Sequence, residues 1–66
     1  MICLKIDEED VELRVSKDEL LMLNNALNEI CNGVDIPEVE FQTRLAFERS
    51  NFRVLLAQIS GLLPQT

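Results

Sequence analysis

The sequence predicts a small α+β domain: a β-hairpin, a helix, a short third strand and a second helix (ββαβα), with both helices on one face of a small antiparallel sheet. Three observations support this prediction. The hydrophobic share of 47% is enough for a folded core, and the length of 66 residues corresponds to a single domain over residues 1–66. Apolar side chains alternate near the N-terminus, as they do in strands. Further along, they recur at helical spacing.

Residues 1–16 have the pattern of a hairpin. A period of two gives each strand one apolar and one polar face. The apolar positions are Ile2, Leu4, Ile6, Val11, Leu13 and Val15. The intervening residues 7–10 are four carboxylates that lack the glycine and the ligand spacing of a calcium loop, so we interpret them as a solvated turn. Cys3 falls on the polar face in this pattern, as an exposed thiol of ordinary reactivity.

Residues 17–32 have the clearest helical signals. Ser16 and Glu19 form a capping box, in which each side chain accepts a hydrogen bond from the other residue's backbone N–H. Gly33 suits the left-handed conformation that ends many helices. The apolar stripe that should face the core is Leu20, Leu23, Leu27, Ile30 and Cys31.

Several residues of this helix lie off the apolar stripe and form a candidate contact surface. Leu21 and Met22 point away from the stripe, so either a neighbouring element or a partner covers them. The asparagines Asn25, Asn28 and Asn32 share one side of the helix. They either tie down the following loop through its backbone groups or form a polar recognition strip.

Residues 34–47 carry two conflicting signals. Asp35 followed by Glu38 could begin a helix. Apolar residues alternate strictly from Val39 to Phe47, however, and this alternation is typical of a strand. The alternation favours a short third strand, and a helix over residues 38–45 stays the alternative.

Residues 48–60 are predicted to form the second helix, which Gly61 ends. Arg49 and Arg53 are four positions apart and therefore share one helix face. They form either a solvated basic edge or a docking edge for an acidic partner surface. The residues at helical spacing are Phe52, Leu55, Leu56 and Ile59.

Composition excludes several functions. Twelve acidic residues against six basic ones give a net charge of −6, which opposes binding to nucleic-acid phosphates. The chain has no histidine, the commonest general base and metal ligand, and its two glycines cannot form a phosphate-binding loop. We therefore expect no enzymatic activity, no cofactor, no metal site and no nucleic-acid partner.

The N-terminal residues lack the basic start, long apolar run and cleavage site of a signal peptide. No apolar run approaches the ~20 residues that a membrane span needs. We expect a cytoplasmic protein with free thiols and no membrane contact.

The run from Leu20 to Gly33, with Asn-Asn-Ala-Leu-Asn-Glu at its centre, and the segment Phe41-Gln42-Thr43-Arg44 resemble a group of small uncharacterised bacterial proteins. The resemblance covers nearly the whole chain, implies a bacterial cytoplasmic setting, and brings no known activity or catalytic residues. The sequence departs from the group's pattern at Ala46, where a glycine is expected.

These observations predict a non-enzymatic protein-interaction module, present as a homodimer or as a subunit of a larger assembly. A chain of this length removes only about 60% of its unfolded surface from water, and small domains often gain the missing stability from a partner. The alternative is an acidic inhibitor, similar to an immunity protein or antitoxin, that binds a basic partner protein through electrostatic complementarity.

Overall fold

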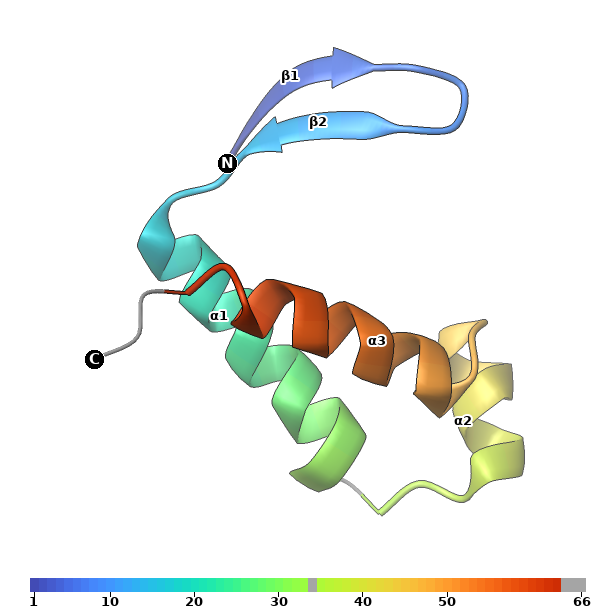
Figure 1. Ribbon diagram of the computed structural model, residues 1–66. Helices are drawn as coiled ribbons and strands as arrows, with labels where there is room; N and C mark the ends of the chain where they lie inside the picture. Colours follow the sequence, from blue (N-terminus) through green and yellow to red (C-terminus); the bar gives the residue numbers. More distant parts are fainter. Residues whose placement is uncertain (34, 64–66) are drawn as a thin grey trace.

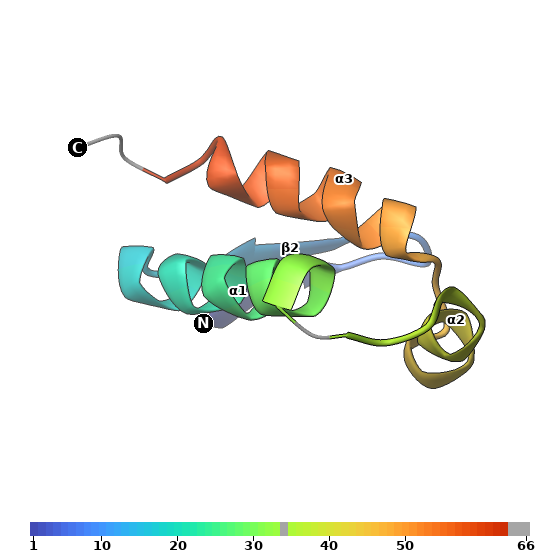
Figure 2. The same ribbon diagram turned by 90° about the horizontal axis from the view of Figure 1, so that it is seen from below.

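The computed structural model describes residues 1–33 and 35–63 and confirms the α+β class. An antiparallel hairpin of β1 (Ile2–Ile6) and β2 (Val11–Arg14) precedes α1 (Lys17–Asn28), which continues into a π-helical turn, η1 (Glu29–Gly33). Two further helices, α2 (Glu38–Leu45) and α3 (Arg49–Ser60), complete the described chain. Helices α1 and α3 lie side by side, and α2 packs against the first turns of α3 (Figures 1 and 2).

The start of α1 confirms the predicted capping box. The backbone N–H of Glu19 donates to Ser16 Oγ at 3.1 Å, and the backbone N–H of Ser16 donates to Glu19 Oε1 at 3.0 Å. The predicted end is different, because the helix widens into η1 and Gly33 does not take a positive φ. Within the wider turn, the Asn32 side chain donates to Asn28 Oδ1 at 3.0 Å.

The third strand predicted between the helices is wrong, because residues 38–45 form α2. An alternating pattern also contains pairs four residues apart, and in α2 the pair Phe41 and Leu45 supplies the inward side of a helix. Glu38 in the first turn and Arg44 in the last turn complement the helix dipole. Arg44 also lies 3.7 Å from Glu40, one turn earlier.

Ala46 ends α2 in the left-handed conformation, with a φ of 67°. Its backbone N–H donates to the carbonyl of Gln42 at 2.8 Å, which closes the last turn. Glycine is the residue that adopts such a positive φ without steric cost, so an alanine here is unusual. Helix α3 then begins after Glu48, whose backbone N–H donates to Asn51 Oδ1 at 3.1 Å.

The helices do not pack on the hairpin, contrary to the predicted arrangement. No Cα atom of β1 or β2 lies within 8 Å of a Cα atom of the described helices. The hairpin stands apart from the helical layer in Figure 1. The buried residues of the described chain are Cys31, Phe41 and Arg49, and all three belong to the helical part. The core is therefore confined to the place where η1, α2 and α3 meet.

None of the helices formed by residues 1–33 and 35–63 has both the length and the apolar character that a membrane crossing requires.

Candidate functional site

The hairpin has one uniformly apolar face, and its strand register defines that face. Residues directly opposite each other in an antiparallel pair point to the same side of the sheet. Cys3 lies opposite Leu13, and Ile6 lies opposite Val11. Since Val11 and Leu13 are two positions apart in one strand, all four side chains share a face. We call Cys3, Ile6, Val11 and Leu13 the hairpin's apolar face.

A β-bulge produces this face. The register shifts between Cys3 and Lys5, so that β1 contains one residue more than β2 across the same span. The shift moves Cys3 to the apolar side, which corrects its predicted place on the polar face. Ile2 moves the other way and lies opposite Arg14. The second face of the hairpin thus contains Ile2, Lys5, Glu12 and Arg14.

The hairpin's apolar face is uncovered. Ile6 is 72% exposed, Val11 55% and Leu13 45%. Every residue of both strands is exposed. The tie between the start of the chain and α1 is an ion pair at the surface, in which the amino group of Met1 contacts Glu19 Oε2 at 2.6 Å. An isolated two-stranded hairpin is at best marginally stable in water.

The same ion pair changes the titration of Glu19. The N-terminal amino group and the backbone and hydroxyl of Ser16 stabilise the charged carboxylate, and they lower the pKa of Glu19 from 4.5 to about 2. The capping box and the anchor of the hairpin therefore depend on one carboxylate.

The predicted contact residues of α1 are all exposed. Leu21 is 48% exposed and Met22 67%, and no described element of the same chain buries them. Asn25 is exposed as well, and the Asn32 side chain donates a hydrogen bond to that of Asn28. A fourth asparagine, Asn24, accepts a 2.5 Å hydrogen bond from Ser60 Oγ and so connects α1 to the end of α3.

Arg49 lies at the centre of the folded core, which corrects its predicted place on a docking edge. The first residue of α3 sends its side chain back toward the end of η1, and Nη1 donates to the carbonyls of Ile30 and Cys31 at 3.2 and 3.1 Å. Nη2 donates to the carbonyl of Ile36 at 2.6 Å, and Nε donates to Glu38 Oε1 at 2.7 Å. The guanidinium thereby donates to two carbonyls near the end of η1, where carbonyls lack partners within the helix, and to one in the loop before α2.

The guanidinium also lies over an aromatic ring. Its carbon is 4.4 Å from the ring centroid of Phe41, which is fully buried and also contacts Phe52 edge-on at 5.4 Å. Arginine over an aromatic face is a favourable cation–π arrangement, and more so when it is desolvated. We call Arg49, Glu38 and Phe41, with the three carbonyls above, the Arg49 cluster. It joins η1, the loop before α2, α2 itself and α3.

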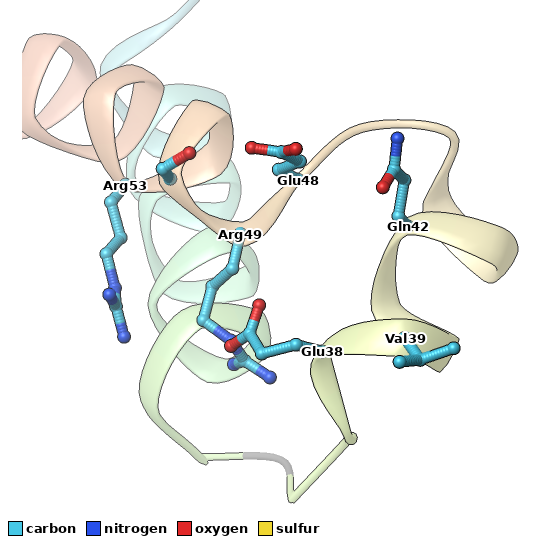
Figure 3. A pocket seen from close by; sticks show the side chains of 7 residues that line it. Glu38, Val39, Gln42, Glu48, Arg49 and Arg53 are labelled. Carbon is cyan, nitrogen blue, oxygen red and sulfur yellow. The ribbon is translucent and has the colours of Figure 1, made fainter.

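The Arg49 cluster borders an open hollow between α2 and α3. Figure 3 shows Arg49 turned toward Glu38, while Arg53 extends away from α3 on the same side. The hollow has a volume of about 410 Å³, and its other lining residues are Val39, Gln42, Glu48 and Ser50. Since the guanidinium of Arg49 is already engaged by the chain, Arg53 is the arginine of the predicted docking pair that faces solvent.

A smaller hollow of about 200 Å³ lies on the apolar side of α3. It is lined by Phe47, Asn51, Phe52 and Leu55. Phe47 is 60% exposed and Leu55 44%, so this hollow adds to the uncovered apolar surface of the described chain.

Sequence reasoning missed the hairpin's apolar face as a contact surface because it assigned the helices to cover it. The signal would have been a sheet of only two strands, and the wrongly predicted third strand concealed it. A two-stranded hairpin without a third strand offers a narrow platform, and the following helices already have each other to pack against. Comparison with protein-family models, curated proteins and solved structures found no match to this chain.

Proposed function

We propose that this protein is a non-enzymatic protein-interaction module. Its contact surface is the hairpin's apolar face together with Leu21 and Met22 of α1. The observation that carries the proposal is the exposure of that face, which no described helix covers. Large uncovered apolar surfaces on small proteins mark protein or membrane contacts. The net charge of −6 disfavours an anionic membrane surface, so protein is the better-supported partner.

The arrangement of polar groups supports a binding role over catalysis. The Arg49 guanidinium, the buried charged group of the described core, already makes four hydrogen bonds to carbonyls and Glu38. Both hollows are open, and the chain has no histidine to act as a general base near either of them.

The alternative function is an acidic inhibitor of a basic partner protein. The exposed turn of Asp7, Glu8, Glu9 and Asp10 at the tip of the hairpin favours it. The two functions differ in their response to salt. Electrostatic attraction to a basic partner weakens as ions screen it, whereas an apolar contact does not.

Affinity capture from a lysate of the source cells with a matched pair of variants tests the proposal. Leu13→Lys and Arg14→Lys both place lysine in β2, but on opposite faces of the hairpin. We expect wild type and Arg14→Lys to retain the same stoichiometric protein, whether another copy or a different chain. Leu13→Lys should retain at least about tenfold less, because a buried lysine costs more than ~1.4 kcal/mol.

Circular dichroism of the helical signal checks that both variants stay folded. Retention of no stoichiometric protein by the wild type, or equal retention by both variants, would overturn the proposed function.

A further inference from the structure

We propose that the partner on the hairpin's apolar face is a second copy of this chain. The inference rests on the proposed interaction function and adds the identity of the partner. Three properties of the chain support it: its exposed surface area, its flat shape and a two-stranded hairpin without a packed layer.

The chain exposes much more surface than a folded monomer of its mass. A globular protein of 7.5 kDa exposes about 4,200 Å² by the scaling of surface with mass. This chain exposes 5490 Å², an excess of about 1,200 Å² over that scaling. Its radius of gyration is 13.5 Å, whereas a compact domain of this length has a radius near 11 Å. The chain measures 36 × 35 × 15 Å along its principal axes, so it is a slab and not a sphere.

The excess area matches the requirement of a stable dimer. If two copies each bury about 1,200 Å², the interface totals about 2,400 Å², within the range of obligate homodimers. A contact of ordinary size with an unrelated protein would cover only about 800 Å² of this chain and leave apolar surface exposed. Contact with a second copy would bury the excess exposed area of both chains in one interface.

The hairpin supplies the geometric reason for self-association. A two-stranded hairpin needs a third strand or a packed layer for independent stability. The described chain has only two strands, and none of its helices packs on them. A two-fold symmetric contact presents the same surface on both chains, so each hairpin is covered by the other copy. The hairpin's apolar face would then be buried in both chains.

Charge predicts how this dimer responds to salt. Each copy has a net charge of −6, so the two chains repel each other at low ionic strength. Added sodium chloride screens that repulsion and should tighten the dimer. An acidic protein bound to a basic partner would show the opposite trend.

Sedimentation equilibrium of the purified full chain tests the proposal. We expect the wild type and Arg14→Lys to sediment at twice the 7.5 kDa chain mass at micromolar concentration, with tighter association at higher salt. Leu13→Lys should require at least about tenfold more protein to associate. This substitution lowers the negative charge of each copy, so electrostatic repulsion cannot explain its dissociation.

A wild type that sediments as a monomer up to several hundred micromolar, in low and high salt, overturns the dimer without using any variant. Equal masses for Leu13→Lys and Arg14→Lys in the dimer range would exclude the apolar face as the interface. A monomeric wild type could still capture a different stoichiometric protein, and lose it on Leu13→Lys substitution. That result would overturn the dimer and support the proposed interaction function, so the failure of one proposal can be told from the failure of the other.

Discussion

The Arg49 cluster and the hairpin show two opposite ways in which this short chain treats its surface. The cluster buries a charged side chain, and four hydrogen bonds and an aromatic ring compensate for the loss of water. The hairpin leaves an entire apolar face in water. The Arg49 cluster provides hydrogen-bond partners for a buried polar group within the chain. The hairpin leaves its apolar side chains without a packing partner among the described elements.

Under the proposed function, this difference separates the helical part, whose core lies within the chain, from the hairpin, which a partner would cover. The cluster joins η1, α2 and α3, which follow one another in the sequence, through contacts within the chain. The hairpin forms its own ladder but has no layer to pack against among the described elements. We therefore expect the helical part to determine the stability of the chain and the hairpin to determine association.

The largest expected effect comes from breaking the cluster. Arg49→Ala removes the donors of three carbonyls and the partner of Glu38, and should lower the free energy of unfolding by about 3 kcal/mol. Arg53→Ala, four residues later on the exposed side of α3, should change it by less than about 0.5 kcal/mol. Urea denaturation followed by circular dichroism, at one fixed protein concentration, measures both. Equal losses for the two variants would contradict a structural role specific to Arg49.

A smaller effect of opposite sign is expected at the end of α2. Ala46 has a φ of 67°, a conformation that disfavours any side chain with a Cβ by about 1–2 kcal/mol. Ala46→Gly should raise the free energy of unfolding by about 0.5–1 kcal/mol, since glycine's greater freedom in the unfolded chain offsets part of the gain. The matched change Ala57→Gly inside α3 should lower it by about 1 kcal/mol. Destabilisation by both glycines would mean that Ala46 is not left-handed in solution.

The smallest effect concerns the tie between the hairpin and α1. Folding lowers the pKa of Glu19 to about 2, so its contribution is present above the ordinary value of 4.5 and is lost as the pH falls toward 2. The wild type should thus lose stability in this pH range more steeply than Glu19→Gln, which cannot titrate there. Thermal melts between pH 5 and pH 2, together with carboxyl titration by NMR, provide the measurement. Parallel pH profiles for the two proteins would contradict the linkage.

The parts of the fold that depend on local signals could be predicted from the sequence. The cap of α1 needs only Ser16 and Glu19, three residues apart, and the structure confirms it. The α2 helix was mistaken for a strand because an alternating pattern also places Phe41 and Leu45 one helical turn apart. What decides between the two is the packing of Phe41 against Arg49 and Phe52, which belong to the next helix and lie outside the alternating segment.

The candidate site was predictable only in part. Leu21 and Met22 were identified as off-stripe residues, and their exposure agrees with that position. Cys3 was placed on the wrong face, because a single bulge reverses the side of every residue before it and sequence alternation does not reveal the bulge. The spacing between Arg49 and Arg53 is the same whether the side chain of Arg49 is exposed or buried. Only the packing of α2 and η1 around it shows that it belongs to the core.

The most direct test of the central claim uses the two cysteines already in the chain. Cys3 lies on the hairpin's apolar face and is exposed in the single chain, whereas Cys31 is buried in the helical core. Alkylation of the native wild type, followed by mass spectrometry of each cysteine, reports on both sites in one experiment. A second copy covering the hairpin predicts that Cys3 becomes slower to react as protein concentration rises, while Cys31 stays protected throughout. A Cys3 thiol that reacts at the same unhindered rate at every concentration would contradict the account.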